Sequence, residues 1–173
     1  MNNEELSLDG RLKLRPVVMP DDTDFLIRLY AGTRDDLAIL PIDEHQKKAL
    51  LLMQYEAQKQ GYAVEYPNAI DQIVLLDEKP IGRYMIERKP GEIFGVDLAL
   101  LPENRSLGIG TQVIRSSFEE AAATKSNFVL HVVKSNRAVR LYLRLGCVVA
   151  GNTETHHEMT WQPSNSGNKT TIE

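Results

Sequence analysis

Residues 70 to 100 form the stretch that most restricts the fold of this chain. Short apolar runs, IVLLD, IGRYMIER and EIFGVDLALL, follow one another there, with turn-forming residues between them at 78–80 and 89–91. Such runs bounded by turn signals are typical of β-strands joined by hairpins. The stretch therefore predicts three consecutive strands in an antiparallel meander.

The residues before the meander predict one strand and two helices. Residues 11–18 alternate like a half-buried strand, and acidic residues at 21, 22 and 24 suit the first turn of a helix that ends near Gly32. Asp43 can cap a second helix over residues 43–60. The predicted helix faces consist of Phe25, Leu26, Leu29 and Tyr30 in the first helix, and Ala49, Leu50, Met53 and Ala57 in the second.

The residues after the meander alternate between helices and strands. We expect a helix from the glycines at 108 and 110 to about Thr124, a strand over 127–133, a helix over 136–145 ended by Gly146, and two strands between 147 and 161. The whole order predicts an α/β (α+β) fold, with a mixed, mostly antiparallel central sheet of about seven strands and helices on both faces.

Composition is that of one globular domain. The 173 residues, 42% hydrophobic and 25% charged, predict a single domain over 11–161, a flexible segment at 1–10 and a disordered polar tail at 162–173. A net charge of −4 predicts no nucleic acid partner, and no apolar run approaches the roughly 20 residues that span a membrane. The polar amino terminus and the single Cys147 favour a cytoplasmic location.

Two glycines one residue apart stand in the loop RSLGIG at 105–110, between the third meander strand and the next helix. The P-loop pattern does not fit because no lysine follows Gly110, and the dinucleotide fingerprint does not fit because Val113 replaces its third glycine. Unpaired amides at a helix start favour an anion, and glycine lets a phosphate approach the backbone. From this loop alone, a phosphate-binding site and an ordinary glycine turn both remain open.

A second motif, NRAVRLYLRLG at 136–146, decides between these alternatives. Together, the two motifs resemble the GNAT superfamily of N-acetyltransferases, and the element order from Leu12 to Trp161 agrees with that fold. Cys147, where the family usually has an aromatic residue, and Leu107, where Gly, Lys or Gln is frequent, depart from its pattern. The matching residues are Arg105, Gly108 and Gly110 in the loop, and Asn136, Ala138, Leu141, Tyr142, Leu145 and Gly146 in the second motif.

The resemblance implies acetyl-CoA as the co-substrate. Its diphosphate would lie on the backbone amides of residues 106–111, and its pantetheine arm along the end of the third meander strand. Asn136 would hydrogen-bond this arm, cap its own helix, or do both. The residues implied for the co-substrate are Leu98, Leu100, Arg105, Ser106, Leu107, Gly108, Ile109, Gly110, Thr111 and Asn136.

Acetyl transfer to an amine needs an acid for the departing thiolate and a base for the amine. Tyr142 is the predicted acid, because the motif places its hydroxyl near the sulfur; a packed tyrosine is the alternative. Asp97 is the first candidate for the base, because a carboxylate in an apolar strand is costly without a purpose. Glu87, His131 and a chain of water molecules remain alternatives for that role.

The remaining polar groups do not point to one functional role each. Arg137, Arg140 and Arg144 share one side of a helix and either meet the ribose phosphate or form a solvated basic face. HisHisGlu at 156–158 predicts no metal site, because neighbouring side chains in a strand point to opposite faces. Cys147 is not a predicted nucleophile, because nothing near it in the sequence would lower the pKa of its thiol. The early tyrosines either line the acceptor pocket or pack; they are Tyr30, Tyr55, Tyr62 and Tyr66.

The residues and the resemblance together predict an N-acetyltransferase that moves an acetyl group from acetyl-CoA to a primary amine of a small molecule or a peptide. The amine would attack directly in a ternary complex. The alternative is a non-catalytic acyl-CoA sensor or interaction domain with the same fold. The acceptor, the acyl-chain preference and the oligomeric state, a homodimer included, stay open.

Overall fold

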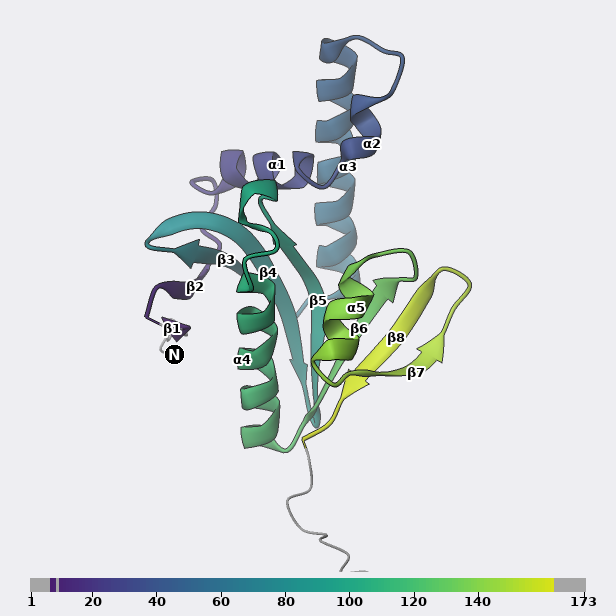
Figure 1. Ribbon diagram of the computed structural model, residues 1–173. Coiled ribbons are helices and arrows are strands. Elements are labelled where there is room, and N and C mark those ends of the chain that lie inside the picture. Colours follow the sequence, from purple (N-terminus) through teal and green to yellow (C-terminus); the bar gives the residue numbers. More distant parts are fainter. Residues whose placement is uncertain (1–6, 9, 164–173) are drawn as a thin grey trace, which may run out of the picture.

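The computed structural model describes residues 7–8 and 10–163, whose strands form one sheet (Figure 1). In that part of the chain eight strands follow the order β1-β2-β3-β4-β5-β6-β8-β7, and all neighbours are antiparallel except β5 and β6. The strands are β1 (Ser7–Leu8), β2 (Leu12–Pro16), β3 (Ile70–Leu76), β4 (Lys79–Lys89), β5 (Glu92–Leu100), β6 (Asn127–Val133), β7 (Val148–Asn152) and β8 (His156–Trp161).

This sheet confirms the predicted fold class. The eighth strand is the two-residue β1, which pairs with the start of β2 in a segment for which the sequence predicts no strand. The predictions for residues 1–6, 9 and 164–173 lie outside the described residues.

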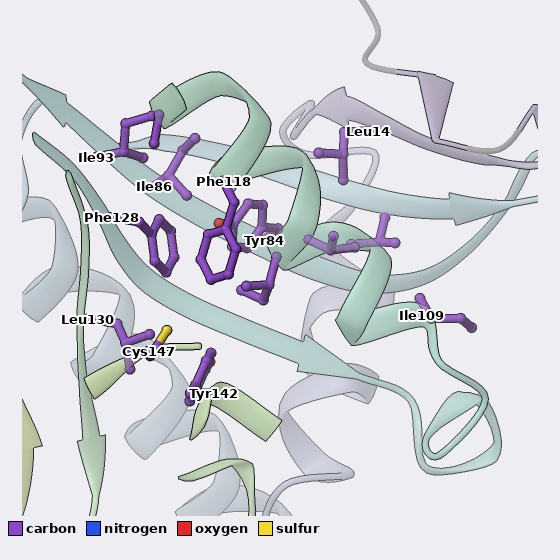
Figure 2. Close-up of a cluster of buried hydrophobic side chains, with 14 of the residues drawn as sticks. Leu14, Tyr84, Ile86, Ile93, Ile109, Phe118, Phe128, Leu130, Tyr142 and Cys147 are labelled. Carbon is purple, nitrogen blue, oxygen red and sulfur yellow. The ribbon is translucent and has the colours of Figure 1, made fainter. Parts of the chain in front are cut away.

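Helices cover both faces of the sheet, as predicted (Figure 1). The larger core lies beneath α4 (Ile109–Thr124) and α5 (Ala138–Arg144), where Phe118 packs edge-on against Phe128 (Figure 2). The smaller core lies beneath α1 (Thr23–Ala31) and α3 (Glu44–Glu65). Along β3, Val74 belongs to the larger core and Ile73 to the smaller one, as strand alternation requires. Two short elements, α2 (Asp35–Ala38) and the 3-10 helix η1 (Pro102–Asn104), join longer ones.

The hairpin between β3 and β4 turns at Asp77 and Glu78, and not at 78–80 as the sequence predicts. These two residues have φ angles of 48° and 64°, and Pro80 already pairs with Leu75 inside the ladder. A two-residue hairpin loop favours positive φ at both positions, because that backbone twist matches the twist of the strands.

The buried face of α3 also differs from the prediction. Asp43 caps the helix as expected, but Met53 is 62% exposed, Ala49 and Ala57 are exposed, and Tyr55 is the buried residue. The amino-terminal half of α3 extends beyond the sheet (Figure 1), so that only the side carrying Tyr55 meets another layer. Within residues 10–163, no helix has the length and apolar character needed to cross a membrane.

Candidate active site

The site begins where β5 and β6 separate. These parallel strands pair only from Glu92 to Gly95 on β5, and the remainder of β5 pairs with β4 alone among the described strands. A bulge near Val96 shifts the register between β4 and β5 at this point. Because a bulge bends its strand, β5 turns away from β6 and keeps one backbone edge free up to Leu100.

A cavity of about 690 Å³ opens beside this free edge. It is lined by the end of β5, the glycine loop, the first turn of α4 and one side of α5. The cavity brings together most of the residues implied for the co-substrate, namely Leu98, Leu100, Arg105, Ser106, Gly108, Gly110, Thr111 and Asn136. It does not include the side chains of Leu107, which is 64% exposed to solvent, and Ile109, which is buried in the larger core.

Arg105 holds the glycine loop in place. Its Nε donates to the carbonyl of Leu100 at 3.0 Å, and its Nη2 donates to the carbonyl of Gly32 at 2.7 Å. The loop bends through positive φ angles at Ser106 (62°) and Gly108 (81°), and Gly108 is the N-cap residue just before α4. Among the described residues no side chain caps α4, so the amides of its first turn remain available to an anion in the cavity.

Gly110 has a different reason to be glycine. A Cβ at this position would lie 3.7 Å from Leu141 Cδ2 and 3.8 Å from Leu98 Cδ2, which are ordinary contact distances. The protein itself therefore has room for a side chain here. Leu98 and Leu141 both line the cavity, so a longer side chain would occupy the space that a ligand needs.

Two arginines, Arg137 just before α5 and Arg144 at its end, add positive charge to the cavity. Arg137 and Arg144 line it, and neither has a carboxylate within 4 Å among the described residues. The uncapped helix start, the space at Gly110 and these arginines together fit an anionic ligand such as the diphosphate of acetyl-CoA. Asn136 caps the first turn of α5, because its Oδ1 accepts the amide of Ala138 at 2.9 Å.

Tyr142 lies at the inner end of the cavity. It projects from α5 toward the larger core, close to Cys147 and Leu130 (Figure 2), and is 9% exposed. Its hydroxyl makes no hydrogen bond to any described residue. Burial, and then the negative charge of Asp97, raise its pKa to about 12. The hydroxyl is therefore a protonated, unpartnered donor at neutral pH.

Asp97 lies on β5, in the part of the strand that has separated from β6. With Tyr142 and His131 it lines a small cavity of about 20 Å³, which is room for about one water molecule, between β5 and β6. Its side chain is 27% exposed. Burial raises the pKa of the Asp97 carboxyl, and Arg83, whose Nη1 lies 3.8 Å from its Oδ2, acts against this shift. The carboxylate is thus a stronger base than one in water.

The two rivals for the base differ in position. Glu87 is buried, is paired with Lys89 at 2.9 Å and lines neither cavity. His131 lines the small cavity and lies 3.5 Å from Glu158, measured from Nε2 to Oε2. Geometry therefore keeps Asp97 and His131 as candidates for the base and places Glu87 outside both cavities.

Two of the early tyrosines pack on other aromatic rings, and the Cys147 thiol is buried. Tyr30 packs on Tyr55 with ring centroids 5.7 Å apart, and Tyr66 stacks on Phe94 at 5.5 Å, beside the split. Burial raises the pKa of the Cys147 thiol to about 11, so it stays protonated at neutral pH. In residues 10–163, no three His, Cys, Asp or Glu side chains are placed to hold a metal ion.

Sequence reasoning did not identify two residues near the site. Thr33, which follows α1, lines the larger cavity, and no pattern in the sequence marks it. Arg83 stands in the apolar run IGRYMIER, where its charge is the signal that could have found it. A charged residue in a buried strand needs a partner, which is the signal that singled out Asp97.

This chain is similar to a known protein family in sequence and to solved structures in fold. A family model described as an acetyltransferase (GNAT) domain matches residues 27–148. The PaiA N-acetyltransferase from Thermoplasma acidophilum, in complex with coenzyme A, has a TM-score of 0.64 at 14% identity, with 87% of this chain and 98% of that chain covered. A ribosomal-protein-S5-alanine acetyltransferase from Vibrio fischeri has a TM-score of 0.61 at 16% identity, with 94% and 98% covered.

FdhC, a nucleotide-linked sugar GNAT, has a TM-score of 0.63 at 16% identity, with 93% of this chain and 91% of that chain covered. At such identities these similarities show the fold alone. No curated protein sequence matches the chain significantly.

Proposed function

Because the chain belongs to the GNAT family of acetyltransferases, we propose that it transfers an acetyl group from acetyl-CoA to a primary amine by direct attack in a ternary complex. One observation carries the proposal: a single cavity joins the uncapped start of α4 to the unpartnered hydroxyl of Tyr142. The first feature suits a diphosphate, and the second suits an acid at the reacting bond. A sensor domain would need only the first.

The chain would hold acetyl-CoA along the larger cavity. The amides of residues 106–111 would bind the diphosphate, and Arg137 and Arg144 would face its negative charges. The free edge of β5 near Leu98 and Leu100 would pair with the amide groups of the pantetheine arm, as an added strand does. Asn136 keeps its side-chain NH₂ for the same arm while its oxygen caps α5.

Acetyl-CoA supplies the thioester, and the chain moves two protons. The Asp97 carboxylate accepts a proton from the amine, directly or through one water molecule, as the nitrogen bonds to the acetyl carbon. The C–S bond breaks, and the hydroxyl of Tyr142 donates its proton to the departing sulfur. Burial raises the pKa of both groups, which suits a base that must capture a proton and an acid that must stay protonated.

The proposed acceptor is the primary amine of a small molecule or a peptide, reached from the face that carries α1 and α3. Tyr62 of α3 lies near Asp97 on that face, and Tyr66, which follows α3, packs on Tyr62 and Phe94. An aromatic ring beside a carboxylate suits an ammonium group. The fold does not narrow the acceptor further, because similar folds act on different acceptors. A cytoplasmic location, without nucleic acid or membrane partners, is part of the proposal.

Saturating CoA is expected to raise the melting temperature of the protein. A ligand at about a hundred times its Kd adds about 2.7 kcal/mol to the stability of the native state. For a domain of this size, that corresponds to roughly 5 to 10 °C. Differential scanning fluorimetry measures the shift, and pantetheine, which lacks the diphosphate, should produce a smaller one. An unchanged melting temperature with CoA would contradict the co-substrate assignment.

Free thiol is expected to appear when the protein, acetyl-CoA and a panel of amines and amino-terminal peptides are mixed. Ellman's reagent measures the thiol, and mass spectrometry of the acceptor should show one added acetyl group. Tight acetyl-CoA binding without turnover across a broad panel would favour the non-catalytic sensor instead.

A further inference from the structure

Three charged side chains form a row across neighbouring strands next to the split. Arg83 on β4 lies between Asp71 on β3 and Asp97 on β5. Its Nε and Nη2 donate to the two carboxylate oxygens of Asp71, both at 2.7 Å. Its third nitrogen, Nη1, faces Asp97 Oδ2 at 3.8 Å. One arginine thus serves two carboxylates in different ways: Asp71 anchors it, and Asp97 receives its remaining charge.

The row is shielded from water. The Arg83 side chain is 11% exposed, and both carboxylates are 27% exposed. The ring of Tyr62, from α3, lies 5.5 Å from the guanidinium carbon. Because the charges are partly desolvated, their interactions are stronger than those of surface pairs. Arg83 cannot rotate away without breaking the two hydrogen bonds to Asp71 and leaving the tyrosine ring.

We propose that Arg83 is a positioning residue that holds the Asp97 carboxylate in place and charged at the split between β5 and β6, where it accepts the proton of the acceptor amine. This role rests on the proposed function. Asp71 holds the Arg83 side chain through two hydrogen bonds and partly neutralises its positive charge. Asp97 is stabilised as an anion by a cation that it shares, so it stays both ionised and basic.

The groups that face Asp97 determine whether a change of charge raises or lowers the pKa of its carboxyl. Arg83 favours its anion, and Asp71 disfavours it through like charge. The neighbouring backbone amide of Leu98 also favours the anion and lowers the pKa of Asp97. Tyr62 of α3 and Tyr142 of α5 are neutral at physiological pH, and His131 of β6 lines the same small cavity. Removing Arg83 must therefore raise the pKa of Asp97, and removing the charge of Asp71 must lower it.

The test follows the Asp97 carboxyl carbon by NMR during a pH titration of the ligand-free protein, and measures kcat/KM against pH in parallel. Asp97→Asn identifies the carbon signal and the acidic limb of the rate profile. Arg83→Gln should move both midpoints up by about one pH unit, so that kcat/KM on this limb falls about tenfold. Arg83→Lys, which keeps the charge, should return the midpoints toward the wild-type values. Asp71→Asn should move them down.

Arg88→Met is the matched control, because Arg88 is also on β4 but pairs with Glu120 of α4. It should leave both midpoints unchanged while removing the same charge. Unchanged midpoints in Arg83→Gln would overturn the role of Arg83. If Arg83→Gln does not fold, Asp71→Asn provides the test. Midpoints that stay at the wild-type pH in Asp71→Asn would then overturn the role of Arg83. Absence of turnover in the wild type, with the NMR shifts as expected, would refute the proposed function and leave the charge row standing.

Discussion

Replacing Tyr142 with Phe is expected to lower kcat about a hundredfold, with little change in the affinity for acetyl-CoA. The change removes one hydroxyl that has no hydrogen bond to any described residue, so the stability of the fold should change little. Positioned general acids contribute about 10²- to 10⁴-fold to a rate, which sets the size of the effect. Steady-state kinetics give kcat, and calorimetry gives the Kd of acetyl-CoA.

Tyr55→Phe is the matched control. Tyr55 is also buried and has a raised pKa, but it packs on the opposite face of the sheet from the larger core. Its replacement should leave kcat within about twofold of the wild type, as remote substitutions do. In the wild type, Tyr142 should lose its proton, and kcat should fall for that reason, only as the pH approaches 12. Its raised pKa keeps the hydroxyl protonated below that value. An unchanged kcat in Tyr142→Phe would remove Tyr142 from the mechanism.

Replacing Gly110 with Leu is expected to weaken acetyl-CoA binding by at least about tenfold without unfolding the protein. Gly110 has an α-helical backbone without a positive φ, and among the described residues a Cβ there meets Leu98 and Leu141 at ordinary distances. A leucine side chain would extend beyond that Cβ into the larger cavity. Calorimetry measures the loss of affinity, and thermal denaturation checks the fold.

Two controls separate crowding of the cavity from a general effect on helices. Gly110→Ala should keep most of the affinity and stabilise α4 by about 0.5 to 1 kcal/mol, because alanine loses less backbone freedom than glycine. Gly61→Leu adds the same side chain to α3, where its Cβ meets no atom within 4 Å, and should leave binding unchanged. Equal loss of affinity in Gly61→Leu and Gly110→Leu would contradict the assignment of the cavity.

The sequence predicted the elements and their order well, because local rules decide them. The positive φ at Gly108 and Gly146, and the cap of α3 at Asp43, lie where the residue types require them. The turn at 78–80 and the buried face of α3 were wrong for the same physical reason. Strand register and the layer that covers a helix depend on residues far away in the chain.

The candidate site divides in the same way. The sequence by itself indicated the candidate residues for the chemistry: a glycine loop before a helix, Tyr142 in its motif, and a carboxylate in an apolar strand. Only the tertiary structure decided how they meet. The bulge at Val96 opens β5 from β6, and pairing of three strands brings Arg83 between Asp71 and Asp97. Such distances are set by strand register and packing, which act between residues that no local pattern connects.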